Sequence, residues 1–284
     1  MTIIGVIAQG TMGSGVGRRL RESGAEVRTL LSGRSPASAE RARAAGMVAA
    51  ADERALLDGA DFCLSILPPG EAEPLARRLA PTLAALDRKP VYIDCNAVSP
   101  QTAIRIGEVV TPTGAHFVDA GIIGGPPRPG YSPAIYASGP TATQTAVLRD
   151  WGIDWRVIDG QIGAASAVKM SYAGITKGTT AITAAMLIGA AHFGCAEALI
   201  AELSSSQPQM LARMRSGIPG MYDKAYRWVA EMEEISDFLE ENPPSRDMYA
   251  AIARLYGYLA AAHAEAQPGP DNAIRILDRV LGRG

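Results

Sequence analysis

A short apolar strand that runs into a glycine-containing turn opens the chain and limits its fold more than any other feature. Residues 3–7 are expected to form a buried strand, and residues 15–20 begin a helix. In such a strand–turn–helix unit, glycines let the backbone approach a pyrophosphate that the helix N-terminus holds. The first glycine of the usual G-x-G-x-x-G pattern is an alanine, which disfavours a positive φ. The dinucleotide contacts predicted for this turn are Ala8, Gln9, Gly10, Thr11, Met12 and Gly13.

The end of the second apolar run, residues 26–31, indicates which dinucleotide binds. NAD-binding units usually place an Asp or Glu there, about 20 residues after the glycine turn, on the ribose 2′-hydroxyl. This chain has Ser32, Gly33, Arg34 and Ser35 instead. A guanidinium and two hydroxyls suit a 2′-phosphate, so the predicted cofactor is NADP. The alternative is an ordinary strand–turn–helix with packing glycines and a solvated Arg34.

Composition excludes several classes of protein. The chain has 284 residues, of which 48% are hydrophobic, and a formal net charge of −2, so it lacks the concentrated positive charge of a nucleic-acid-binding protein. The Ala-rich stretch 179–191 is too short for a membrane span, and the N-terminal apolar run has no basic flank of a signal peptide. Three scattered cysteines are expected to be buried in a reducing compartment. We therefore expect a cytoplasmic protein without a nucleic-acid or membrane partner.

The chain divides into two halves of different texture. In the first half, expected strands alternate with expected helices. The strands are expected at 3–7, 26–31, 62–66, 91–94, 116–120, 134–138 and 155–157, and the helices at 37–45, 51–57, 71–86 and 100–109. This alternation predicts an α/β Rossmann domain, a doubly wound parallel sheet, over residues 1–162. Residues 163–284 read as helix only: one long or once-broken helix over 164–203, then helices at 208–215, 222–241, 246–265 and 271–281, separated by prolines that include Pro219.

Segments that follow strand ends in the first half are candidates for the ligand site, because open α/β sheets bind ligands there. Leu67 and Pro68 follow the third strand, residues 94–100 follow the fourth, and residues 119–127 follow the fifth. The glycine pair in the last segment could approach an anionic or carbonyl oxygen, or could be a structural loop.

The first helix of the second half carries Lys169 among small and apolar residues. A desolvated lysine loses pKa and can exchange protons near neutrality. Ser166 and Tyr172, three residues to either side, share its helix face, and Lys177 two turns on could pair with an anionic group. The alternative is that both lysines extend to solvent. A metal is not expected, because the three histidines are far apart.

Together these motifs resemble the β-hydroxyacid dehydrogenases, the family of 3-hydroxyisobutyrate and 6-phosphogluconate dehydrogenases. The resemblance implies a Rossmann domain and an all-α domain that contributes to substrate binding and dimerisation, and hence a homodimer. It implies that Lys169 is the general acid/base and that Leu67 and Pro68 contact the cofactor. The family's Ser-Thr pair falls on Asn96 and Ala97.

Two departures from the family pattern lie in the substrate site. The family's Ser-Gly-Gly is Ile123, Gly124 and Gly125, and the asparagine expected four residues after the lysine is Ala173. Segments 119–127, 169–177 and 227–234 resemble a bacterial phosphogluconate-dehydrogenase-like subgroup with its own C-terminal domain. In the last segment, Arg227, Glu231 and Glu234 are expected to form a salt-bridged surface.

These observations predict hydride transfer between NADP(H) and a small hydroxy or keto substrate. The predicted catalytic residues are Lys169 and Tyr172, the nicotinamide is expected near Leu67, Pro68 and Asn96, and the predicted substrate contacts are Asn96, Ala97, Ile123, Gly124, Gly125 and Lys177. The lost serine and asparagine leave two alternatives open: an imine reductase-like enzyme that reduces C=N, and a non-catalytic NADP-binding protein.

Overall fold

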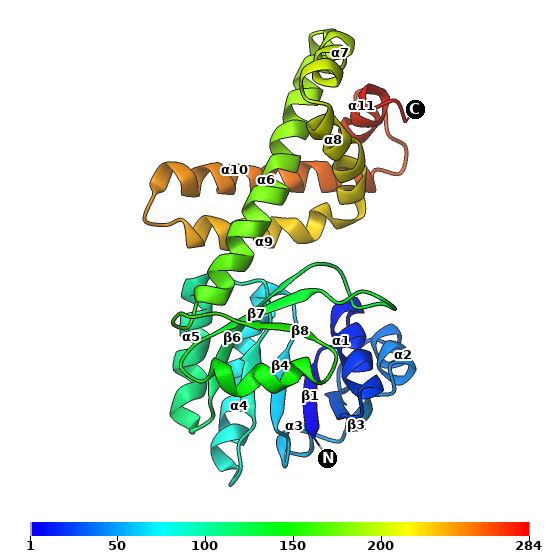
Figure 1. The fold of residues 1–284 in the computed structure, drawn as a ribbon. Coiled ribbons are helices and arrows are strands. Elements are labelled where there is room, and N and C mark those ends of the chain that lie inside the picture. The colour runs from blue at the N-terminus through cyan, green and yellow to red at the C-terminus, as the bar shows by residue number, and fades with distance from the viewer. Residues whose placement is uncertain (1, 284) are drawn as a thin grey trace. The chain divides into compact units, whose positions relative to one another are not determined.

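The computed structural model describes residues 2–283 and divides into two compact units, one ending at Met170 and the other beginning at Ser171 (Figure 1). Residues 1 and 284, which the predicted domain ranges include, lie outside the described residues. The division falls within helix α6 (Ala164–His192), whereas the predicted boundary lies just before this helix begins. As a result, Lys169 belongs to the first unit.

The first unit, as far as residues 2–170 are described, is built on an eight-stranded sheet of order β3-β2-β1-β4-β5-β6-β7-β8. Its strands are β1 (Ile3–Ile7), β2 (Glu26–Leu30), β3 (Val48–Ala50), β4 (Phe62–Ser65), β5 (Val91–Asp94), β6 (Phe117–Ile123), β7 (Ala134–Ser138) and β8 (Asp154–Val157). Every neighbouring pair is parallel except β6 and β7. The predicted doubly wound Rossmann class is confirmed, with the strand order reversing between β1 and β4.

The sheet differs from the sequence prediction in two places. The edge strand β3 was not predicted, because its three residues are too few to show an alternating pattern. The expected all-parallel arrangement is wrong for β7, because the proline-rich segment after β6 folds back as a hairpin. Arg128 and Tyr131 exchange backbone hydrogen bonds of 3.1 and 2.9 Å across this hairpin, so β7 returns antiparallel to β6.

Helices cover both faces of the sheet, as predicted for a parallel α/β sheet. They are α1 (Thr11–Glu22), α2 (Pro36–Ala44), α3 (Glu53–Leu57), α4 (Ala72–Ala85) and α5 (Pro100–Val110), with 3₁₀ segments η1 (Pro69–Glu71), η2 (Thr111–Thr113) and η3 (Ala142–Arg149). One core cluster contains Val16 and Leu20 of α1 together with Trp155 of β8. Another cluster contains Leu79 of α4 and Ile106 of α5. The apolar strands are therefore buried from both sides.

The second unit is helical throughout its described part. It contains the rest of α6, then α7 (Ala196–Ser206), α8 (Pro208–Met221), η4 (Tyr222–Lys224), α9 (Ala225–Phe238), α10 (Pro243–Ala264) and α11 (Ala273–Val280). The stretch expected as one long or once-broken helix breaks near Gly194, which has a φ of +67°. Pro219 was expected to separate two helices, but it lies inside α8. Within residues 2–283, no helix has the length and apolar character needed to cross a membrane.

The three cysteines do not share one environment. Cys63 and Cys95 are buried as expected, and burial raises the pKa of the Cys63 thiol to about 12. Cys195 is exposed beside the break between α6 and α7, so the expectation of burial is wrong for this residue.

Candidate functional site

The turn between β1 and α1 is compact, and the helix that follows has no side-chain cap. A Cβ on Gly13 would lie 1.7 Å from the Ala8 carbonyl oxygen, so only glycine fits there. A Cβ on Gly10 would meet nothing within 4 Å, and Gly10 gives α1 no side-chain hydrogen bond. Ala8 does not have a positive φ, so alanine is tolerated in place of the usual glycine. The first amides of α1 are therefore available to an anion.

Gln9, whose side chain is fully buried, connects this turn to β2 and to two arginines. Its Nε2 donates to the hydroxyl of Thr29 on β2. Its Oε1 accepts a hydrogen bond from Nε of Arg34 at 3.5 Å, and its backbone carbonyl accepts one from Nε of Arg41 at 2.8 Å. Arg41 comes from α2 and was not predicted from the sequence. The available signal was a basic residue on the helix that follows the second strand.

A cavity of about 550 Å³ opens at the carboxyl end of β2. It is lined by Ile7, Leu30, Ser32, Gly33, Arg34, Ala51, Asp52, Glu53, Leu67, Glu71, Pro74, Leu75 and Arg78. Four of the predicted cofactor residues, Ser32, Gly33, Arg34 and Leu67, thus line one cavity. Ser35 instead caps α2, since its Oγ accepts from the Ser38 amide at 3.2 Å. Apolar side chains share this lining with charged ones, including the carboxylates of Asp52, Glu53 and Glu71, so a ligand there would meet both apolar and charged groups.

The side chain of Asn96 ties the carboxyl ends of β4 and β5 together. Its Nδ2 donates to Asp94 and to the Ser65 hydroxyl, the latter at 2.8 Å, and its Oδ1 accepts from the Leu67 amide. Asn96 is only 2% exposed. The internal hydrogen bonds of this side chain fix Leu67, beside the exposed Pro68, and the predicted contact of Asn96 with the cofactor and the substrate stays a prediction.

Two buried carboxyl groups lie in register on neighbouring strands. Asp94 on β5 pairs with Asp119 on β6. Burial, followed by the negative charge of Asp119, raises the pKa of Asp94 to about 7. Burial also raises the pKa of Asp119, although hydrogen bonds to its carboxylate oppose this rise.

Asp119 anchors the start of α6 to the sheet. Its carboxylate accepts from the amides of Gly163 and Ser166 at 2.9 and 3.0 Å, and from the Ser166 hydroxyl at 2.6 Å. Ser138 on β7 donates to the same carboxylate at 3.2 Å. These bonds satisfy amides at a helix N-terminus and set where the next turn of α6 lies.

Lys169 lies on the second turn of α6, half-buried against β6. A Cβ on Gly121 would be 2.8 Å from the Lys169 Cβ, so the lysine stem packs directly on the strand near its carboxyl end. Within residues 2–283, the Lys169 ammonium group forms no hydrogen bond or ion pair. A positioned amino group without such a partner among these residues is suited to exchange a proton with a ligand.

Tyr131, which the sequence analysis does not predict as a site residue, contacts the glycine pair Gly124 and Gly125 after β6. The Gly125 amide donates to the Tyr131 hydroxyl at 3.2 Å. A Cβ on Gly124 would lie 2.2 Å from that hydroxyl, which explains the glycine. Ile123 ends β6, and Ala97 lies half-buried in the loop after β5.

The two remaining predicted site residues belong to the second unit. Tyr172 is 52% exposed. Lys177 forms an ion pair with Glu231 of α9, and its Nζ lies 5.0 Å from the ring centre of Trp228. The side chains of Lys177 and Glu231 are each 16% exposed, so Glu231 does not belong to the salt-bridged outer surface expected for its segment.

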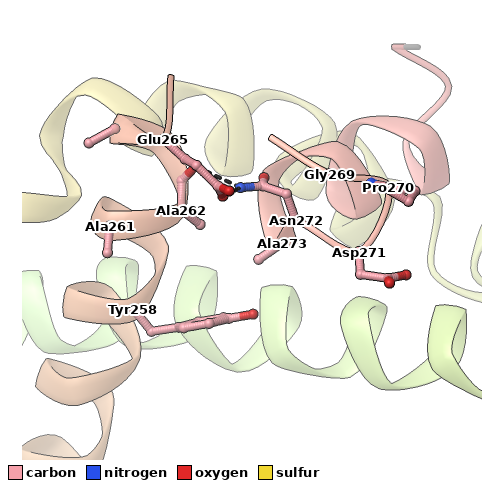
Figure 2. Close-up of a pocket in the computed structure, with 10 residues that line it drawn as sticks. Tyr258, Ala261, Ala262, Glu265, Gly269, Pro270, Asp271, Asn272 and Ala273 are labelled. Carbon is pink, nitrogen blue, oxygen red and sulfur yellow. Dashed lines mark hydrogen bonds between the residues drawn. The ribbon is translucent and has the colours of Figure 1, made fainter. Parts of the chain in front are cut away.

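Another cavity, of about 590 Å³, lies in the second unit beside the start of α11 (Figure 2). The ring of Tyr258 forms one wall, and the side chains of Asn272 and Glu265 meet on the opposite side. Asn272 donates to Glu265 at 2.8 Å and caps α11 by accepting from the Ile274 amide at 3.0 Å. None of the predicted site residues lines this cavity.

Comparison with known proteins places these features in a family. Residues 3–151 match the family described as the NAD binding domain of 6-phosphogluconate dehydrogenase, and residues 190–259 match a domain of unknown function. A conserved protein of unknown function, whose structure is described as similar to 3-hydroxyacid dehydrogenases, is 30% identical, with a TM-score of 0.71, and the match covers 93% of this chain and 100% of that chain.

Two solved structures show the same fold at lower identity. The 3-hydroxyisobutyrate dehydrogenase of Mycobacterium tuberculosis is 20% identical, with a TM-score of 0.75 and 99% of each chain covered. The imine reductase of Myxococcus stipitatus in complex with NADP⁺ is 17% identical, with a TM-score of 0.54, 99% of this chain covered and 100% of that chain. On the match to residues 3–151, the 30% identical relative and the Rossmann unit described above, this chain belongs to the β-hydroxyacid dehydrogenase family of nicotinamide-dependent oxidoreductases.

Proposed function

We propose that this protein is an NADP-dependent oxidoreductase that transfers a hydride between NADP(H) and a small hydroxy or keto substrate, with Lys169 as general acid/base. The placement of Lys169 carries the proposal. The lysine stem is fixed against Gly121 in the same unit as the glycine turn, while its ammonium group has no partner among residues 2–283. Proton transfer by a positioned group of this kind typically contributes roughly 10²–10⁴-fold to rate.

The first unit fits a dinucleotide that carries a 2′-phosphate. The N-terminus of α1, which lies within the turn Ala8–Gly13 and has no side-chain cap, would hold the pyrophosphate, and the cavity beside Ser32 and Gly33 would hold the adenosine. Arg34 would bind the 2′-phosphate, because residues 31–35 contain no carboxylate for a ribose hydroxyl. Leu67 and Pro68 would border the nicotinamide, which supplies or accepts the hydride when it is bound.

The chain's own residues would carry the proton. In the oxidative direction, the neutral amine of Lys169 would accept the hydroxyl proton and become an ammonium, and in the reductive direction the ammonium would return a proton to the oxygen. Tyr172, three residues later on α6, is a second candidate for this step. To bind an anionic substrate group, Lys177 would have to give up its ion pair with Glu231 and pair with that group instead.

The substrate is proposed to contact Ala97, Ile123, Gly124 and Gly125. Ile123 and the buried Ala173 offer neither the hydroxyl nor the amide that the family pattern places there. A carboxylate held in the family's usual way is therefore not the proposed ligand.

Reduction of a C=N bond is the second candidate activity. It is supported by the same loss of polar groups at Ile123 and Ala173, and by the fold shared with an imine reductase. Lys169 argues against it, because imine reductases of this architecture usually lack the lysine.

We also propose that the protein is a cytoplasmic homodimer that pairs through α6. Exposed apolar side chains recur along this helix and its C-terminal end, at Tyr172, Ile175, Ile182, Met186 and Phe193. Their exposed fractions range from 50% to 83%. Apolar side chains gathered in this way are expected to be covered by another surface, here that of a second copy.

A substrate panel tests the activity. Oxidation of NADPH is followed with 2- and 3-oxo acids, aldehydes and cyclic imines for the wild type, Lys169→Ala and the control Lys224→Ala, which changes an exposed lysine of η4. We expect carbonyl turnover that falls at least 100-fold in Lys169→Ala and stays unchanged in the control. Unchanged turnover in Lys169→Ala would refute the acid/base role, and turnover of imines alone would favour the second candidate.

A pair of arginine variants tests the cofactor. Arg34→Ala should weaken NADPH binding by roughly tenfold or more and leave NADH binding nearly unchanged, because only NADPH carries the 2′-phosphate. Arg43→Ala is the control, since Arg43 is exposed and paired with Glu40 on α2. Equal losses for both cofactors would exclude the 2′-phosphate assignment.

A further inference from the structure

A second guanidinium lies beside the proposed 2′-phosphate site. Arg41 is on the last turn of α2, six residues after Ser35, yet its side chain reaches back to the glycine turn. Its Nε donates to the Gln9 carbonyl at 2.8 Å, and its Nη2 donates to the Ser38 hydroxyl at 3.0 Å. The guanidinium is therefore held at the N-terminal end of α2, where the Ser35 hydroxyl lies 3.2 Å from that of Ser38.

Gln9 brings this group close to Arg34. The same residue accepts from Arg34 through its side chain and from Arg41 through its backbone. Gln9 itself is held firmly, because it is fully buried and donates to Thr29, whose hydroxyl in turn donates to the Val6 carbonyl at 2.7 Å. Two guanidinium groups thus converge on one fixed residue of the dinucleotide turn.

Neither cation is neutralised by a carboxylate in the part of the chain that the structure describes. Among residues 2–283, Arg34 and Arg41 form no ion pair, although nearby Arg43 pairs with Glu40 and Arg78 pairs with Glu53. Arg41 is half-buried, so its charge is less screened by solvent than that of a surface arginine. Two adjacent, uncompensated guanidinium groups disfavour each other unless an anion joins them.

We propose that Arg41 is a second ligand of the cofactor's 2′-phosphate and that Gln9 positions it together with Arg34. This inference rests on the proposed NADP dependence and deepens it. A phosphate monoester carries close to two negative charges at neutral pH, which two guanidinium groups match better than one. Ser38, which touches both Ser35 and Arg41, completes the ring of polar groups around the site.

Direct binding measurements test Arg41 without relying on turnover. Dissociation constants for NADPH, NADH, adenosine 2′-monophosphate and adenosine 5′-monophosphate are measured by titration calorimetry for the wild type, Arg34→Ala, Arg41→Ala and the control Arg43→Ala. We expect Arg41→Ala to weaken NADPH and adenosine 2′-monophosphate binding by roughly 10- to 100-fold, while NADH binding changes less than about twofold. Arg43→Ala should match the wild type.

Arg41→Gln is a second variant that should preserve the turn. The glutamine side-chain amide can still donate to the Gln9 carbonyl, but it carries no charge. Loss of NADPH binding in Arg41→Gln, with NADH binding retained, supports the proposal even if Arg41→Ala misfolds. Wild-type NADPH affinity in Arg41→Gln, or equal losses for both cofactors, overturns it. If Arg34→Ala is selective and the Arg41 variants are not, only this inference fails. If the wild type does not prefer NADPH over NADH, the proposed NADP dependence is wrong, and the inference about Arg41 is rejected with it.

Discussion

Gly121 and Lys169 lie so close that a Cβ on the glycine would come within 2.8 Å of the lysine Cβ and within 2.9 Å of the Ala165 carbonyl oxygen. Because the side chain of Gly121 is a hydrogen atom, α6, which carries the proposed acid/base Lys169, can pack closely against β6. This contact lies wholly within the first unit, so it joins the sheet, the cofactor turn and Lys169 in one compact body.

Gly121→Ala should displace the start of α6 and destabilise the protein. Overpacking of this kind costs about 1–3 kcal/mol, and the displacement of Lys169 should lower turnover as well. Urea unfolding monitored by circular dichroism measures the stability. The matched control is Gly125→Ala, where a Cβ meets nothing within 4 Å and the change should stay within about 0.5 kcal/mol. Equal stabilities of the two variants would contradict the close packing.

Asp119→Ala should release the N-terminal turn of α6 from the sheet. The substitution leaves the amides of Gly163 and Ser166 without their acceptor, and we expect a loss of about 3 kcal/mol in the free energy of unfolding. Asp150→Ala, on an exposed aspartate, serves as the control. Hydrogen exchange should show faster exchange at the start of α6 in the Asp119 variant. Wild-type exchange rates there would show that Asp119 does not anchor the helix.

Asp94 should make the protein less stable as the pH rises towards neutrality. The pKa of its carboxyl group is about 7 in the folded protein, against an ordinary value of 3.8. Between these values the folded state binds more protons than the unfolded state, so the stabilising contribution of the neutral carboxyl is complete below the lower pKa and is lost as the pH rises through about 7. A shift of this size corresponds to at most about 4 kcal/mol.

Asp94→Asn tests this pH dependence, because its amide remains neutral at every pH. The free energy of unfolding is measured for the wild type and the variant at pH values of about 5 and about 8. We expect the variant to gain stability relative to the wild type at the higher pH. Asp150→Asn should show no such gain, and parallel curves for Asp94→Asn and the wild type would rule out the raised pKa.

The ion pair between Lys177 and Glu231 should contribute more than a surface pair. Lys177→Met and Glu231→Gln each remove one charge of a largely buried pair, so each should destabilise the protein by about 2–4 kcal/mol, and the double variant by less than the sum. Glu233→Gln on the same helix is the exposed control. Strict additivity in a double-mutant cycle would show that the two charges are not coupled.

Substitution of Phe193 should dissociate the proposed dimer. Phe193→Glu places a charge directly after the C-terminal end of α6, on the most exposed of these apolar side chains, which is 83% exposed. Light scattering coupled to gel filtration is expected to show a dimeric wild type and a monomeric variant. Val147→Glu, on an exposed residue of η3, should remain dimeric. A monomeric wild type would exclude the dimer.

Local patterns were sufficient to predict most of the first unit's elements. The predicted strands differ from the observed ones by only a few residues at their ends, because apolar runs between glycine and proline breakers determine where strands lie. The direction of β7 was not predictable in the same way. A hairpin between Arg128 and Tyr131 closes only when the chain pairs with β6, which is a contact between strands rather than a property of either.

In the candidate site too, some residues were predictable from local sequence patterns, whereas others depend on contacts between distant segments. Ser32, Gly33 and Arg34 were found from their place after the second strand, and they share one cavity. The internal hydrogen bonds of Asn96 were not foreseen, because Ser65 and Leu67 approach it from a neighbouring strand. The spacing of Arg41 on α2 does not predict that its side chain returns to Gln9, because that contact depends on how α2 packs beside the turn.

The sequence by itself determined the strand–turn–helix at the N-terminus, the basic end of the second strand and the helical second half, since glycine conformations, hydrophobic periodicity and side-chain charge act over a few residues. Only the tertiary structure decided that Gln9 accepts hydrogen bonds from both Arg34 and Arg41. It also decided that Asp119 anchors the start of α6 and that the Lys169 side chain packs against Gly121. These relationships join residues 25 to 48 positions apart, and they exist only after the sheet has formed and brought its carboxyl ends together.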